Sequence, residues 1–241
     1  RNGGERSAIR QVELPVPCTC RKILDGHNRN RDMSKTIMVL APHTDDGEFG
    51  CGGTIAKYVA EGARVVYAAF SAAEQSVLPH LPRDILRTAV RLATAALGVR
   101  DEDFLVFDFE VRRFSEFRQR ILDRMISLNR EYTPDIVFLP SANDTHQDHQ
   151  TIAVEGFRAF KRTTMLGYEV PWNNLDFRTS CFVEIDEAYL DLKIAAVGMY
   201  QSQRHRSYAS AEFIRSLALT RGVQIGKRYA ETFEVVRWVI S

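Results

Sequence analysis

The feature that most constrains the fold is a regular alternation, from residue 36 onward, of short apolar runs with longer amphipathic ones. Such alternation is typical of a mostly parallel sheet flanked by helices, because buried parallel strands have nearly continuous apolar sequences. We expect strands at residues 36–41, 63–71, 103–109, 135–140, 180–185 and 229–240. We expect helices at residues 54–61, 82–97, 114–132, 150–161, 187–200 and 210–221. The sequence therefore predicts a doubly wound α/β domain.

The first 35 residues differ from the rest of the chain. They are rich in Arg, Asn and Gly, and they show neither helical nor strand periodicity. A chain of 241 residues is long enough for one large core. We therefore predict a flexible leader at residues 1–35 and a single domain at residues 36–241.

Charge and composition exclude several classes of partner. The chain has 32 Lys and Arg against 31 Asp and Glu, so its net charge of +1 gives no general attraction to nucleic acid. No apolar run approaches the roughly 18 residues of a membrane-spanning helix, and four cysteines suggest no disulfide framework. We expect a cytoplasmic protein without stable membrane insertion and without a nucleic-acid partner.

Two polar loops, one after the first expected strand and one after the fourth, are dense in metal ligands. Their sequences are PHTDDGE at residues 42–48 and SANDTHQDH at residues 141–149. In open parallel sheets, ligands bind beyond the carboxyl ends of the strands, where two loops diverge. His and Asp suit Zn²⁺, and a catalytic zinc site keeps a fourth position open beside three protein ligands. The two loops predict a divalent-metal site, with zinc as the preferred ion.

The adjacent Asp45 and Asp46 suggest a division of labour, because neighbouring side chains at a strand end point in different directions. One can ligate the metal while the other acts as a base. Helix capping is the alternative for an aspartate at this place. Capping would account for one aspartate, but not for His43 or for the cluster of His146, Asp148 and His149.

Other residues near these loops have simpler interpretations. The segment GCGG at residues 50–53 matches no nucleotide-binding spacing, so we interpret it as a turn that allows close backbone packing. Cys51 is either an extra soft ligand or a small packing residue, and packing is favoured. His27, His80 and His205 do not cluster with other potential metal ligands in the sequence and are interpreted as ordinary core or surface histidines.

The motifs resemble those of the LmbE-like family of zinc-dependent N-deacetylases, also called the PIG-L family. The family's first motif, (A/P)-H-P-D-D-x-E-x-G-x-G-G, appears as PHTDDGEFGCGG, and its second, H-x-D-H, appears at residues 146–149. Residues 221–233 are similar to the family's R-G-x-x-x-G-x-x-Y-A-E-x-F stretch. The resemblance covers about residues 36–238. It implies a Rossmann-like fold whose active site lies at the C-terminal ends of the strands.

The resemblance also implies roles for individual residues. His43, Asp46 and His149 would be the zinc ligands, and Asp45 would be the general base that takes a proton from a water activated by zinc. His146 would stabilise the oxyanion or protonate the departing amine, and Asp148 would orient a neighbouring histidine. The implied reaction hydrolyses the acetamido group of an N-acetylated amino sugar or sugar conjugate, releasing acetate and a free amine.

The chain departs from the family pattern in two places. Thr44 replaces the usual Pro, and the family's R-x-x-E pattern is incomplete, with Arg87 as the candidate for its arginine. Glu74 is a candidate substrate contact or a solvated loop charge. The resemblance further implies a homo-oligomer. Two alternatives stay open: a metal-dependent hydrolase of another bond, and a non-catalytic metal- or nucleotide-binding protein on a Rossmann-like scaffold.

Overall fold

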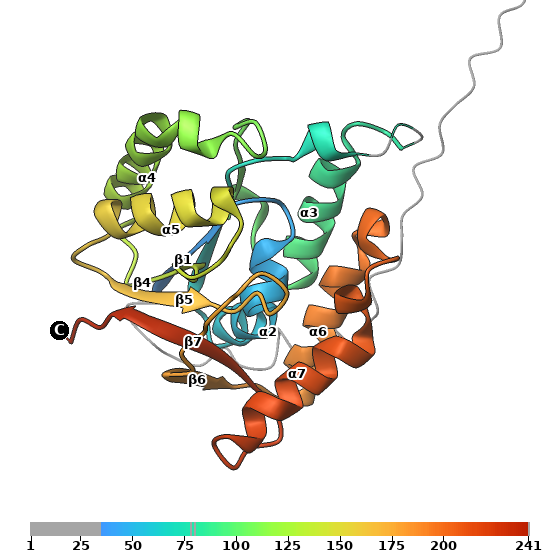
Figure 1. Cartoon of the computed structure of the whole chain (residues 1–241). Helices are drawn as coiled ribbons and strands as arrows, with labels where there is room; N and C mark the ends of the chain where they lie inside the picture. The colour runs from blue at the N-terminus through green and yellow to red at the C-terminus, as the bar shows by residue number, and fades with distance from the viewer. Residues whose placement is uncertain (1–34, 78, 80, 241) are drawn as a thin grey trace, which may run out of the picture.

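The computed structural model describes residues 35–77, 79 and 81–240, so nearly all of the leader predicted at residues 1–35 lies outside it. In these residues, seven strands form one mixed sheet in the order β3-β2-β1-β4-β5-β7-β6 (Figure 1). The strands are β1 (Thr36–Ala41), β2 (Arg64–Ala69), β3 (Phe104–Val106), β4 (Ile136–Pro140), β5 (Thr164–Tyr168), β6 (Cys181–Glu184) and β7 (Ala230–Arg237). Strands β1 to β5 pair in parallel, and β7 pairs antiparallel with both β5 and β6.

The helices cover both faces of this sheet. They are α2 (Asp46–Ala60), α3 (Ile85–Ala96), α4 (Arg118–Tyr132), α5 (Gln147–Ala159), α6 (Glu187–Gly198) and α7 (Ala211–Val223). Figure 1 shows α4 and α5 on one side of the sheet, with α2, α3 and α6 on the other. The predicted doubly wound α/β architecture is confirmed.

Alternation along β1 explains why both faces are covered. Ile37 and Val39 pack in the cluster that contains α2, α3 and α6, whereas Met38 and Leu40 pack in the cluster formed with α4 and α5. All four side chains are fully buried, because successive residues of a strand point to opposite faces of the sheet. This explains the uninterrupted apolar sequence of β1.

The position of β1 fixes where a ligand can bind. β1 pairs with β2 on one side and with β4 on the other, so the strand order changes direction beside it. The chain leaves β1 into α2 and leaves β4 into α5, which lie on opposite faces of the sheet. The loops after β1 and β4 therefore diverge at a topological switch point, the usual ligand site of such folds.

The structure differs from the sequence prediction in two elements. The segment at residues 50–53, predicted as a turn, lies inside α2, which begins at Asp46 and has one non-helical residue, Cys51 (φ −146°, ψ 25°). Strand β5 was not predicted, because its sequence TMLGY is short and contains a glycine, which is unfavourable in strands. Tertiary packing overrides local propensity at both places. Among the described residues, no helix combines the length and the apolar character needed to span a membrane.

Candidate metal centre

Three ligand atoms from the two diverging loops meet at one point. His43 lies in the β1–α2 loop, Asp46 is the first residue of α2, and His149 lies in the first turn of α5. Their ligand atoms all lie within 4.8 Å of one another. Nδ1 of His43 is 3.1 Å, and Nε2 of His149 is 3.3 Å, from the same oxygen, Oδ2 of Asp46. The structure thus brings together the three residues predicted as ligands.

In each of the two histidines, the ring nitrogen that does not face Asp46 contacts a buried aspartate. Nε2 of His43 is 2.9 Å from Oδ2 of Asp148, and Nδ1 of His149 is 2.7 Å from Oδ2 of Asp144. Both aspartates are completely buried. Such carboxylates fix the ring orientation and the tautomer of metal-binding histidines. Each ring therefore has one nitrogen on a carboxylate and the other directed to the common point.

These aspartates also secure the loops that carry the site. Asp148 accepts hydrogen bonds from the backbone N–H groups of Arg112 (2.6 Å) and Phe114 (3.2 Å), which ties a third loop to the centre. Asp144 accepts one from the backbone N–H of His146 at 2.8 Å. Sequence reasoning expected Asp148 to orient a neighbouring histidine, and the histidine that it contacts is His43, 105 residues away in the chain. It missed Asp144, whose only signal was its place in the ligand-rich loop.

The electrostatics of the cluster fit a bound cation. Burial opposes charge on both rings, but the carboxylates of Asp46, Asp148 and Asp144 outweigh it and raise the pKa of His43 to about 9 and that of His149 to about 10. Burial also opposes charge on Asp46, yet His149 and His43 hold its pKa well below the ordinary value. The cluster thus favours positive charge at its centre, and two nitrogen donors with one oxygen donor suit a divalent ion with an open fourth position.

A second possible ligand group, His43 with His146 and Asp148, overlaps the first. Asp148 already accepts two backbone N–H groups and contacts His43 Nε2. Nδ1 of His146 accepts the backbone N–H of Asp148 at 3.2 Å. Asp148 and Nδ1 of His146 are therefore already hydrogen-bonded, and the group built on Asp46 is the better metal site.

Two titratable groups flank the metal ligands, one from each loop. Asp45 is half-buried, and burial together with neighbouring Asp46 raises its pKa to about 6. It makes no side-chain capping hydrogen bond to α2, so capping does not explain it. The ring of His146 lies 4.9 Å from that of His43 and 4.8 Å from that of His149. Burial and the nearby His43 lower the pKa of His146, which favours the neutral ring at neutral pH.

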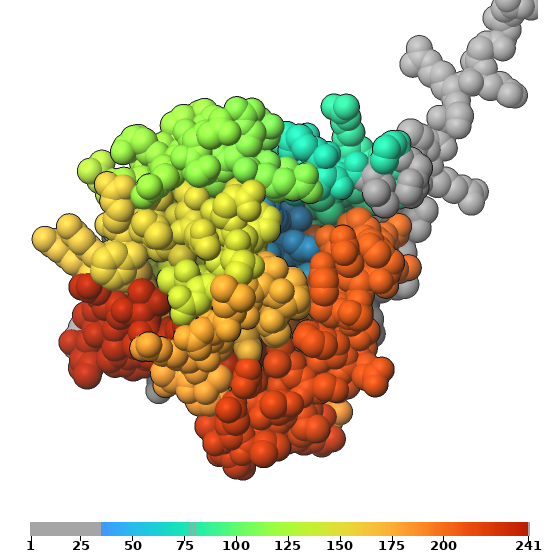
Figure 2. Space-filling view, viewed as in Figure 1, coloured from blue at the N-terminus to red at the C-terminus, as the bar shows by residue number. Residues whose placement is uncertain are grey.

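An open cavity of about 310 Å³ lies over these groups. His43, Thr44, Asp45 and His146 are among its lining residues. Figure 2 shows the hollow, with the blue β1–α2 region at its floor between the yellow-green, teal and orange parts of the chain. The candidate substrate contacts Glu74 and Arg87 are not in this lining. Arg87 Nε contacts Glu74 Oε1 at 2.6 Å, so these two residues pair with each other, and their contact with substrate stays a prediction.

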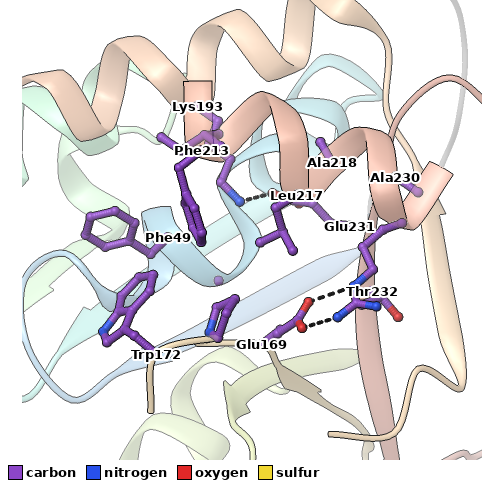
Figure 3. Close-up of a pocket in the computed structure, with 14 residues that line it drawn as sticks. Phe49, Glu169, Trp172, Lys193, Phe213, Leu217, Ala218, Ala230, Glu231 and Thr232 are labelled. Atoms are coloured by element: carbon purple, nitrogen blue, oxygen red, sulfur yellow. Dashed lines mark hydrogen bonds and ion pairs between the residues drawn. The ribbon is translucent and has the colours of Figure 1, made fainter. Parts of the chain in front are cut away.

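In a second pocket, beside α7 and β7, the charged side chains pair with one another. In it Lys193 Nζ donates to Glu231 at 2.6 Å, and Arg221 pairs with Glu169 (Figure 3). Its volume of about 20 Å³ is close to that of a single water site. We therefore interpret this pocket as part of the packing of the fold and not as a binding site. Two of its four charged groups, Arg221 and Glu231, come from the C-terminal stretch that resembles the family motif.

Cys51 belongs to the packing around α2. It is completely buried, and neither of the two possible ligand groups of the described residues includes it. Burial raises the pKa of its thiol well above the ordinary value, which disfavours the thiolate that a metal requires. The interpretation as a packing residue fits these observations.

Comparison with known proteins agrees with this geometry. The chain is 27% identical over 228 residues to the diacetylchitobiose deacetylase of Thermococcus kodakarensis, covering 84% of this chain and 83% of that protein. The crystal structure of the conserved protein TT1542 from Thermus thermophilus superposes with a TM-score of 0.74 at 25% identity, covering 85% of this chain and 96% of that one. GalB, the 4-carboxy-2-hydroxymuconate hydratase of Pseudomonas putida, has a TM-score of 0.72 at 20% identity, covering 86% of this chain and 98% of that one, which shows a shared fold alone.

The sequence profile of one family covers the metal centre itself. The family is described as PIG-L, GlcNAc-PI de-N-acetylase, and the match spans residues 38–160, just over half of the chain. This span includes both ligand loops, most of β1, all of β2 to β4, and α2 to α5. The chain therefore belongs to the PIG-L family of deacetylases, as its motifs predicted.

Proposed function

We propose that this protein is a zinc-dependent N-deacetylase that converts an N-acetylated amino sugar or sugar conjugate to acetate and a free amine. The observation that carries the proposal is the arrangement at the cavity floor. A complete set of three metal ligands is flanked by Asp45 and His146, two titratable groups that lie outside that set. A site that only stored a metal would need neither of them.

The chemistry divides among the residues as follows. A divalent cation held by His43, Asp46 and His149 would supply Lewis acidity for amide hydrolysis. Asp45, with its pKa raised to about 6, is ionised at neutral pH yet basic enough to take a proton from the attacking water. Asp148 and Asp144 keep the ligand histidines in place.

His146 acts on the other side of the reacting carbonyl. Because its Nδ1 accepts the backbone N–H of Asp148, the neutral ring carries its proton on Nε2. From there it can donate a hydrogen bond to the oxygen that gains charge as water attacks. The proton that the leaving nitrogen needs is the one that Asp45 takes from water, and its delivery restores the Asp45 carboxylate, so proton uptake and release balance over the reaction.

Two substitutions test this assignment. In zinc-loaded protein, Asp45→Ala should retain the metal but lower acetate release by about 10³-fold or more, because it removes the base without removing a ligand. His149→Ala should lose the metal itself. Metal content by elemental analysis and acetate release from diacetylchitobiose and N-acetylglucosamine derivatives are the measurements. Equal metal content in the two variants would refute this division of roles.

The alternatives predict other outcomes of the same assay. A protein that binds zinc tightly but releases acetate from no N-acetylated sugar would be a binding protein on this scaffold. A protein that instead cleaves phosphoesters with the same metal requirement would be a hydrolase of another bond. Only acetate release that depends on both Asp45 and the metal supports the deacetylase.

A further inference from the structure

The cavity over the metal centre has a basic rim. Arg112 comes from the loop that precedes α4, while His205 and Arg206 come from the segment between α6 and α7, and all three line the cavity. Asp45 is the only carboxylate among its lining residues in the described part of the chain. Figure 2 shows the orange segment between α6 and α7 forming one wall of the hollow. A concave site with this lining focuses positive potential onto its ligand.

Among the described residues, the two arginines of the rim have no ion-pair partner, and Arg112 differs in this from the arginine next to it. Arg113, next to Arg112, pairs with Glu110 and Glu116. Within the residues that the structure describes, no carboxylate lies within ion-pairing distance of Arg112 or Arg206. Their guanidinium groups are exposed. They are therefore available for the two-point recognition of a carboxylate or phosphate that arginine makes well.

The backbone of Arg112 supports a role for its side chain. Its φ of 68° lies in the left-handed region, which glycine adopts readily and a long side chain adopts at a cost in free energy. The conformation is imposed by the centre itself, since the backbone N–H of Arg112 donates to Asp148. Strained backbone of this kind is concentrated at ligand-binding positions. An arginine at a place that suits glycine indicates use of the guanidinium.

A hydroxyl group lies in the same wall. Ser202 lines the cavity, and its Oγ is buried with no hydrogen-bond partner among the described residues. A buried hydroxyl without a partner is costly, so it is expected to meet a polar atom of a ligand. Ser202 thus adds a donor beside Arg206 on the wall that faces Arg112.

We propose that this rim is an anion-binding subsite, so that the preferred substrate is an N-acetylated sugar bearing a carboxylate or phosphate group. Arg112 and Arg206 bind the anion, Ser202 donates a hydrogen bond to the same molecule, and the acetamido group reaches the metal centre. This inference rests on the proposed deacetylase function and specifies its substrate class.

Matched substrates test the subsite. N-acetylglucosamine is compared with its 1-phosphate and its 6-phosphate, which place the anion at opposite ends of the sugar. We expect kcat/KM for the better phosphate to exceed that for the neutral sugar at least tenfold. Arg112→Gly, which removes the side chain and accepts the backbone conformation, and Arg206→Gln should each lower this ratio several-fold. Their combination should bring the ratio close to one.

The control is Arg113→Gln, an exposed arginine of the same loop that is already paired, and it should leave the ratio unchanged. A wild-type ratio near one, or a ratio that the double variant retains, would overturn the subsite. If no sugar releases acetate, the deacetylase proposal fails, and calorimetry on the metal-loaded wild type decides the subsite alone. Tighter binding of a phosphate that the double variant loses supports it, and equal binding of neutral and charged sugars refutes it.

Discussion

The metal centre and the Lys193–Glu231 pair are both buried charged clusters, but they use their donor atoms differently. Glu231 accepts Lys193 Nζ at 2.6 Å and the backbone N–H groups of Gly53 (3.0 Å) and Thr54 (2.6 Å), so the pair satisfies itself within the chain. At the metal centre, two ring nitrogens and a carboxylate oxygen converge on one point. Burial and charge are common to both clusters. Convergent potential ligand atoms distinguish the candidate metal centre from the pair.

The two clusters meet in one helix. Asp46 is the first residue of α2, and Glu231 accepts the N–H groups of the helical segment that resumes after the break at Cys51. Glu231 therefore acts as a cap supplied by a distant strand, β7. The Lys193–Glu231 pair therefore holds the later part of the helix, and the candidate metal centre takes a ligand, Asp46, from its first turn.

Breaking the Lys193–Glu231 pair should have the largest effect on stability. Glu231→Ala would leave Lys193 buried without its partner and two backbone N–H groups without an acceptor, so we expect a loss of about 3–5 kcal/mol in the free energy of unfolding. Urea denaturation measures it. Lys227→Ala, which breaks the exposed pair with Glu184, should cost no more than about 1 kcal/mol. A similar small loss in both variants would contradict the contrast, and folded Glu231→Ala protein should still bind its metal.

Weakening the candidate metal centre should instead lower the affinity for metal. Asp144→Asn replaces the carboxylate that holds His149 Nδ1, and an amide turned to donate there would leave the proton on Nε2, the nitrogen that faces the metal site. We expect the affinity for Zn²⁺ to fall about 10- to 100-fold. Competition with a chromogenic chelator measures this affinity. Asp101→Asn, at an exposed aspartate paired with Arg91, serves as the control, and equal affinities in both variants would exclude the orienting role.

Glu48 is a third buried acid that belongs to neither cluster, and it should have a smaller effect, on the pH dependence of stability. Burial raises the pKa of Glu48 from 4.5 to about 8. The hydroxyls of Tyr67 and Tyr200 each contact both Glu48 and the carbonyl of Thr44, and each has only one proton to donate. The native carboxyl therefore holds a proton that the unfolded chain releases above its ordinary pKa, and its contribution to stability declines as pH rises from about 4.5 to about 8.

Glu48→Gln removes this titration. Relative to wild type, the variant should gain about 2 kcal/mol in unfolding free energy between pH 6 and pH 8. The measurement is urea denaturation at a series of pH values, on metal-stripped protein so that no bound cation acts on the carboxyl. A difference between the two proteins that does not change with pH would show that Glu48 is ionised in the native state.

Much of the fold, and the choice of ligand loops, followed from sequence alone. The apolar sequences of β1 and β4, each followed by a polar loop with His and Asp, identified the sheet edge and the residues that meet there. These features are local in sequence, and parallel sheets place them together. The resemblance to a known family added roles that spacing could not supply.

The remaining features depend on contacts between distant parts of the chain. No local pattern pairs Asp148 with His43, or Glu231 with the backbone at Gly53. The same holds for the basic rim, because Arg112 and His205 join it from separate loops and His205 had no ligand-like company in the sequence. Arg87 and Glu74 pair with each other, a contact that two isolated motif positions could not reveal.

The glycines of α2 have a consequence for engineering this protein. Replacing glycine by alanine in a helix commonly adds up to about 1 kcal/mol of stability, and α2 offers four such positions in its first half. Here a Cβ on Gly47 would come within 2.5 Å of the Tyr67 ring, and one on Gly50 would collide with the ring of Tyr168. Alanine would push the helix, and Asp46 with it, away from the sheet. Thermostabilisation of this enzyme therefore has to begin in other helices. In α2, any gain in helix propensity would come with displacement of Asp46, one of the candidate metal ligands.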